Sequence, residues 1–308
     1  MTVPVTVVGG FLGAGKTTLV NHVLRVATRR YAVLVNDFGA LDVDAALVRA
    51  QEGDVLALSN GCVCCGAGPD LGAGIERLAR LDPPPDWMLV EASGVSDPRR
   101  IGQLVQLEAG VTLDSVVVLV DAAAFSEQLA DPYLEDTLIR QVARADLVVL
   151  NKCDLADEAT RAALAAKLRA LAPTARLATV RGGAFPEALV GLSIGPNGAG
   201  PEGVSRLAAD APDHPFRTCC WRDERPFDEA RLRALLADMP RAVLRIKGVC
   251  LLGEAADPHL LQLAGGRWSL RPYGAGPPKP GLVLIGTAEM PDEPALGALF
   301  AKALLSDR

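Results

Sequence analysis

Short apolar runs rich in β-branched residues recur through the first half of the chain and predict buried strands. They occupy residues 3–10, 31–36, 54–60, 86–92, 114–122 and 145–152. Stretches with helical patterning lie between most of them, such as residues 15–30 and 157–173. Near-continuous apolar strands that alternate with helices are typical of a mostly parallel sheet with helices on both faces. Ligands of such sheets bind at the carboxyl ends of the strands.

The pattern changes in the second half of the chain. Residues 193–214 are rich in glycine, proline and alanine, which is typical of a linker. Residues 215–308 resume with a strand, a helix, further strands and a closing helix. We therefore predict an α/β domain over residues 1–192, a linker over 193–214 and a smaller α+β domain over 215–308.

Composition narrows the class of protein. A chain of 308 residues exceeds what one core usually holds, which agrees with two domains. The net charge of −6 and the lack of a long basic run argue against nucleic acid as a partner. The N-terminus lacks the basic start of a signal peptide, and no uncharged apolar run is long enough to span a membrane. We expect a cytoplasmic protein, in which thiols stay reduced.

The first candidate site is the sequence GGFLGAGKTT, which follows the first predicted strand and opens the first predicted helix. It matches G-x-x-x-x-G-K-[ST], in which backbone N–H groups and a helix N-terminus surround phosphates. Lys16 is expected to reach the β- and γ-phosphates, and the Thr17 hydroxyl to bind Mg²⁺. The residues predicted to contact the nucleotide here are Gly10, Gly13, Ala14, Gly15, Lys16, Thr17 and Thr18.

A second motif, Asn151-Lys152-Cys153-Asp154, lies at the end of the last of these strands. It has the N-K-x-D form, which by resemblance to GTPases implies a guanine-binding site. The Asp154 carboxylate can accept hydrogen bonds from N1–H and N2–H of guanine, a pair that adenine does not offer. Lys152 is expected to lie along the base. The combination with the phosphate-binding loop predicts GTP as the nucleotide.

A third motif, EASG, ends another predicted strand. Glu91 is placed to hold Mg²⁺ through a water, and the N–H of Gly94 to sense the γ-phosphate. Asp121, at the end of the following strand, is a weaker candidate for Mg²⁺, and we favour a structural role for it.

Three of the seven cysteines lie within four positions, at Cys62, Cys64 and Cys65. Their spacing is compatible with a metal site, a redox pair, a disulfide or a packed core. In an extended segment Cys62 and Cys64 point the same way, so two thiolates can converge on one ion. Cys219, Cys220 and Cys250 have no ligand-type residues around them in the sequence, and we expect them to be core or edge residues.

The ordered set GGFLGAGKTTL, NDFG, NGCVCC, EASG and NKCD resembles the CobW-type GTPases, relatives of the nickel-enzyme maturation GTPases. The resemblance covers nearly the whole chain. It implies a P-loop GTPase domain over residues 1–192 and a CobW C-terminal-like domain over 215–308. It also implies GTP-dependent handling of Zn²⁺ or Co²⁺ for a client metalloprotein or a cofactor-synthesis enzyme. We expect GTP hydrolysis to be slow without a partner, because stabilisation of the transition state often needs a group that a partner supplies. A nucleotide-dependent homodimer is a further expectation.

Two departures from the family pattern affect these expectations. Asp37 stands where the family has glutamate, and histidines are few and scattered, which argues against metal storage. We expect the metal ligands to come from Cys62, Cys64, Cys65 and Asp37, with Asp37 or Glu91 as candidates to orient the attacking water. The alternatives are a regulatory GTPase with structural cysteines and an ATP-dependent P-loop kinase.

Overall fold

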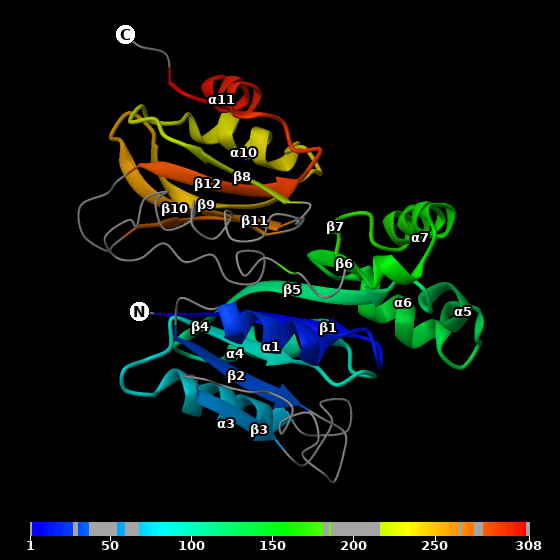
Figure 1. Ribbon diagram of the computed structural model, residues 1–308. Coiled ribbons are helices and arrows are strands. Elements are labelled where there is room, and N and C mark those ends of the chain that lie inside the picture. The colour runs from blue at the N-terminus through cyan, green and yellow to red at the C-terminus, as the bar shows by residue number, and fades with distance from the viewer. Residues whose placement is uncertain are drawn as a thin grey trace. The chain divides into compact units, whose positions relative to one another are not determined.

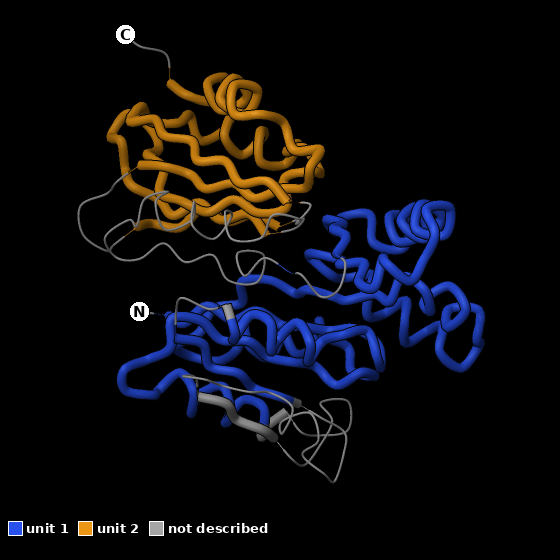
Figure 2. The backbone as a smooth tube through the Cα atoms, viewed as in Figure 1, with its two compact units in different colours: residues 1–191 blue, residues 192–308 orange. Residues whose placement is uncertain are grey.

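A computed structural model describes most of the chain. The described residues are 2–26, 30–36, 54–58, 68–180, 185, 216–264, 267–273 and 280–305. The chain divides into two compact units, residues 1–191 and 192–308 (Figure 2). Each unit is described below by itself.

The first unit is built on a parallel sheet. In the part of the chain that the structure describes, this sheet has seven strands in the order β3-β2-β4-β1-β5-β6-β7, and every neighbouring pair is parallel. The strands are β1 (Val3–Gly10), β2 (Tyr31–Asn36), β3 (Asp54–Leu58), β4 (Trp87–Glu91), β5 (Val111–Asp121), β6 (Leu147–Asn151) and β7 (Arg176–Thr179). The predicted fold class is confirmed, and β1 lies at the centre between β4 and β5.

Helices cover both faces of this sheet (Figure 1). They are α1 (Lys16–Val26), α3 (Gly68–Ala79), α4 (Pro98–Leu107), α5 (Phe125–Ala130), α6 (Glu135–Ala143) and α7 (Glu158–Leu171), with a 3₁₀ turn at Cys153–Leu155. On one face, Ile75 of α3 and Ile101 of α4 share a buried core with Val5 and Val7 of β1. Because side chains alternate along a strand, the neighbouring β1 residues face the opposite side, where α1 packs against β1 and β4.

The second unit is an antiparallel sheet with two helices. In its described part the strand order is β11-β10-β9-β12-β8. The strands are β8 (Phe216–Trp221), β9 (Val243–Leu252), β10 (Asp257–Ala264), β11 (Arg267–Pro272) and β12 (Gly281–Thr287). Helices α10 (Glu229–Ala237) and α11 (Glu293–Ala301) pack on it through Leu232, Leu296 and Phe300. The predicted α+β character of this part is confirmed.

Two strands were not expected from the sequence. They are β7, which extends the parallel sheet beyond β6, and β10, which pairs with β9 and β11. Within the described residues, no helix is long and apolar enough to cross a membrane.

Candidate functional site

The phosphate-binding loop leaves the central strand β1 and enters α1. Its glycines have positive φ angles, 132° at Gly10, 76° at Gly13 and 100° at Gly15, a region that side chains with a Cβ rarely adopt. The N–H of Ala14 donates to the carbonyl of Phe11 over 3.1 Å and closes the turn. The loop therefore has the curled backbone that its motif predicts.

Lys16 begins α1 with its side chain turned back over this loop. Its Nζ donates to the carbonyl of Phe11 at 3.3 Å, and the residue is 8% exposed. The ammonium group thus lies against the loop backbone, where phosphates of a nucleotide would need a cation. Thr18, one residue beyond Thr17, is exposed.

The two candidates for Mg²⁺ meet in space although 74 positions separate them in the chain. Thr17 Oγ1 donates to Oε1 of Glu91 over 2.8 Å. The contact forms because β4 runs parallel to β1, with Glu91 opposite Val8, so that both strands end beside the loop. Glu91 is 2% exposed, so its carboxylate is buried within the site.

The segment after Glu91 is a tight turn. The N–H of Ser96 donates to the carbonyl of Ser93 at 3.0 Å. Gly94 lies against Leu12 of the phosphate-binding loop. The approach is so close that a Cβ on Gly94 would come within 2.5 Å of Cδ2 of Leu12. The turn leads into α4, whose N-cap Asp97 accepts from the N–H of Arg99.

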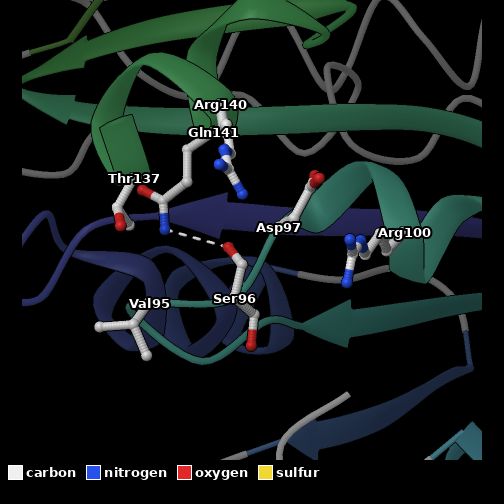
Figure 3. Close-up of a pocket in the computed structure, with 7 residues that line it drawn as sticks. All are labelled: Val95, Ser96, Asp97, Arg100, Thr137, Arg140 and Gln141. Atoms are coloured by element: carbon white, nitrogen blue, oxygen red, sulfur yellow. Dashed lines mark hydrogen bonds between the residues drawn. The ribbon is translucent and has the colours of Figure 1, made fainter. Parts of the chain in front are cut away.

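Gln141 of α6 holds this turn from the other side, and no motif of the sequence indicated it. Its Nε2 donates to the carbonyl oxygens of Gly94 at 2.9 Å and Ser96 at 3.0 Å. Figure 3 shows the contact with Ser96 inside a pocket between α6 and the start of α4. Gln141 lies on the same buried helix face as Leu138 and Val142, and nothing in the sequence indicates the backbone carbonyls that it contacts.

The N-K-x-D motif lies at the end of β6. The amide Nδ2 of Asn151 donates to the carbonyl of Ala14 over 2.9 Å, so this side chain ties β6 to the phosphate-binding loop. Lys152 has a φ of 57°, and its Nζ bonds Oδ2 of Asp121 at 2.7 Å. Asp121 also accepts from the N–H groups of Ala123 and Ala124, which supports the structural role favoured for it.

Asp154 is exposed at the 3₁₀ turn that follows Lys152. Arg161 of α7 braces that turn, since its Nη1 donates to the carbonyls of Cys153 at 2.7 Å and Ala156 at 2.9 Å. Cys153 is buried. The turn therefore presents Asp154 outwards from a fixed backbone, as a base-binding carboxylate requires.

The predicted transition-metal ligands lie outside the described residues. These are Asp37, Cys62, Cys64 and Cys65. Among the residues that the structure does describe, no group of three or more histidine, cysteine, aspartate or glutamate side chains could hold a metal ion.

The cysteines of the second unit are buried or half-buried. Burial raises the pKa of the Cys219 thiol to about 11 and that of the Cys250 thiol to about 12. Cys220 is half-buried, and its pKa is raised for the same reason. Their prediction as core or edge residues agrees with this burial.

Two protein-family models match this chain. Residues 4–179 match the family model described as CobW/HypB/UreG, nucleotide-binding domain. The chain belongs to this family. Residues 216–304 match the model of the cobalamin synthesis protein CobW C-terminal domain, so the family resemblance extends to the second unit.

Several curated members of the CobW/HypB/UreG family are similar over most of their length. The zinc chaperone YjiA of Escherichia coli is 30% identical, with 97% of this chain and 98% of the relative covered. The zinc chaperone CobW of a Sinorhizobium species is 29% identical over 96% of both. The zinc-regulated GTPase metalloprotein activator 1 of Dictyostelium discoideum is 29% identical, with 88% of this chain and 68% of the relative covered.

Proposed function

We propose that this protein is a GTP-hydrolysing zinc chaperone, which binds zinc at the Cys62-x-Cys64-Cys65 loop and releases it to a client protein on hydrolysis. The observation that carries the nucleotide part is the 2.8 Å contact between Thr17 and Glu91 beside the phosphate-binding loop. The names of the relatives, two zinc chaperones and a zinc-regulated GTPase, support zinc as the metal cargo.

The nucleotide site has the donors that Mg²⁺ prefers. The Thr17 hydroxyl and the Glu91 carboxylate are oxygen ligands, and they already converge at one place. A magnesium ion bound between them would neutralise the charge of the β- and γ-phosphates. Lys16 would exchange its contact with the Phe11 carbonyl for the phosphates, and the loop N–H groups would donate to them.

Guanine selectivity rests on Asp154, which accepts hydrogen bonds from the base, and on the side chains that hold the backbone and Lys152 beside it. Asp121 orients Lys152, and Arg161 braces the turn. Asn151 acts through the phosphate-binding loop, since its amide bonds Ala14. A substrate with adenine would leave the Asp154 carboxylate without its two donors, and GTP is therefore favoured over ATP.

The zinc part of the proposal rests on the sequence and the relatives. Thiolates of Cys62, Cys64 and Cys65 favour Zn²⁺, and Asp37 supplies a carboxylate from the segment that follows β2. If GTP orders that segment, hydrolysis removes the order and lowers the affinity for zinc. An incomplete thiolate site also permits transfer to a client metalloprotein by ligand exchange.

A zinc titration with bound nucleotide tests this proposal. The affinity for Zn²⁺ is measured with Mg²⁺ and a non-hydrolysable GTP analogue, and again with Mg²⁺ and GDP. We expect about tenfold tighter binding with the GTP analogue, a typical coupling between two sites. Cys64→Ser should abolish tight binding, whereas the control Cys220→Ser in the second unit should not.

Other outcomes would assign the protein differently. Equal zinc affinities in the two nucleotide states would exclude the switch and favour a regulatory GTPase with structural cysteines. Preference for ATP in competition with GTP would contradict the guanine assignment and favour a P-loop kinase.

A further inference from the structure

Gln141 is a buried polar side chain with a specific pair of partners. It is 2% exposed on α6, and its Nε2 reaches the carbonyls of both Gly94 and Ser96. An amide nitrogen carries two hydrogens, so both of its donors are used on one turn. The partners lie 47 and 45 positions away in the chain, which makes this a tertiary contact rather than a local cap.

Two hydrogen bonds, one within the turn and one from Gln141, fix the orientation of the peptide groups on both sides of Gly94. The carbonyl of Ser93, in the peptide group that carries the N–H of Gly94, accepts from the N–H of Ser96. The carbonyl of Gly94, in the next peptide group, accepts from Gln141. Because a peptide group is planar, a held carbonyl also sets the direction of its N–H. The direction of the Gly94 N–H is therefore set within the turn before any nucleotide binds.

The turn is held on its other side by the phosphate-binding loop. Leu12 lies so close to Gly94 that a Cβ there would come within 2.5 Å of its Cδ2. Val95, at the tip of the turn, is 41% exposed, so its side chain does not anchor the turn in the hydrophobic core. Hydrogen bonds add to the order of the turn, and Gln141 supplies two of them.

We propose that Gln141 is a positioning residue that pre-orders the Gly94 turn for the γ-phosphate and thereby sets the preference of the site for GTP over GDP. The inference rests on the proposed GTPase function. GDP has no γ-phosphate, so its binding does not require the turn to be ordered. GTP must order the turn when it binds, and a turn that is already ordered lowers the entropic cost of that step.

A purely structural role for Gln141 predicts a different result. Helix α6 packs against β1 and α7, so loss of general packing would weaken the whole nucleotide site. GTP and GDP would then lose affinity together, along with thermal stability. The ratio of the two affinities separates the roles.

The test compares Q141M with the wild-type full-length chain. Methionine has the length of glutamine and no hydrogen-bond donor, so the buried volume is nearly kept. Dissociation constants are measured for a non-hydrolysable GTP analogue and for GDP, each with Mg²⁺, together with kcat and KM for GTP. We expect about tenfold weaker binding of the GTP analogue and a similar fall in kcat, with GDP affinity changed less than about twofold. Gln128→Met, at a half-buried position of α5, is the control and should change none of these.

A second variant, Q141E, tests the donors themselves. Its carboxylate would face two carbonyl oxygens, so GTP-analogue binding should be weaker than in Q141M near pH 8. Burial raises the pKa of such a carboxyl, and its protonated form regains one donor. The affinity of Q141E for the GTP analogue relative to its affinity for GDP should therefore recover towards about pH 5.5. If Q141M does not fold, this pH dependence decides the question.

The possible failures are distinguishable. Equal losses of GTP and GDP affinity in Q141M, or no loss of either, would overturn the role of Gln141 and leave the GTPase proposal intact. A Q141E variant whose GTP affinity does not recover at lower pH would also overturn it. Wild-type protein that binds neither guanine nucleotide would instead overturn the proposed function.

Discussion

Single side chains hold the two ends of the nucleotide site through separate contacts. At the phosphate end, Thr17 meets Glu91 and Gln141 holds the Gly94 turn. At the base end, Asp121 bonds the ammonium group of Lys152, a residue whose backbone has a φ of 57°. GTP and GDP carry the same base and make the same contacts at the base end. A substitution there should therefore lower the affinities for GTP and GDP by the same factor.

Asp121→Asn tests this at the base end. The carboxylate accepts from Lys152 Nζ at 2.7 Å, and its side chain is 13% exposed, so removal of its charge weakens a partly shielded contact. We expect GTP and GDP to bind about fivefold more weakly, and by the same factor. The measurement is the dissociation constant of a fluorescent GDP and of a fluorescent GTP analogue.

A matched control for Asp121→Asn is available in the second unit. Asp223 pairs with Arg225 at 2.8 Å, and Asp223→Asn makes the same change of charge away from the nucleotide motifs. It should leave both affinities unchanged. A loss that affects GTP more than GDP in Asp121→Asn would contradict the separation of the two ends.

The sequence predicted the residues that carry standard motifs but not those that support them. Lys16, Thr17, Glu91 and Gly94 could be found because their spacing is set by the chemistry of phosphate and Mg²⁺. Gln141 and Arg161 could not, since each acts on backbone carbonyls that any residue provides. Asn151 was assigned to the nucleotide from its motif, whereas its amide contact to Ala14 depends on the sheet order, in which only β5 separates β6 from β1.

Elements with long apolar runs were predicted well, and short or interrupted ones were missed. Strand β5, a run of valines and leucines, was found but begins earlier than expected, at Val111, where it pairs with Val3. Strand β7 spans only four residues at the edge of its sheet, too few for a pattern to show. Strand β10 contains Pro258 near its start, and proline argues against a strand when the sequence is considered alone.

Strand β9 carries a buried thiol that should make the stability of the second unit depend on pH. Burial raises the pKa of Cys250 to about 12, from a usual value of 9.0. A folded-state pKa above the unfolded one favours the folded state below pH 9, and this contribution is lost as the pH rises from about 9 towards 12. Cys250→Ala lacks the titrating group, so its stability difference from the wild type should shrink with rising pH, by at most about 1.4 kcal/mol per pH unit.

Chemical denaturation between about pH 8 and pH 10.5 measures this difference. Val249→Ala changes the neighbouring position of β9, which is 1% exposed and does not titrate, so its difference from the wild type should stay constant. A constant difference for Cys250→Ala as well would show that the thiol does not ionise more readily in the unfolded chain than in the folded one.

In the molecule as a whole, each unit has its own hydrophobic core. One core gathers residues of β1, β4 and β5 with their helices, and the other gathers residues of β9, β10 and β12 with α10 and α11. The nucleotide motifs between Gly10 and Asp154 all belong to the first unit, residues 1–191. Stability of the second core should therefore be separable from nucleotide affinity.

Leu232→Ala tests this separation. Leu232 is 0% exposed on α10, within the core of the second unit, and loss of its side chain should cost about 2–5 kcal/mol of unfolding free energy there. Because no nucleotide motif lies in that unit, GDP affinity at a temperature where both units are folded should equal that of the wild type. Ile101→Ala, in the core of the first unit beside β1, is the matched comparison and should lower both stability and GDP affinity. A fall in GDP affinity with Leu232→Ala would mean instead that the fold of the second unit supports the nucleotide site. Hydrolysis in the first unit could then change the stability of the second.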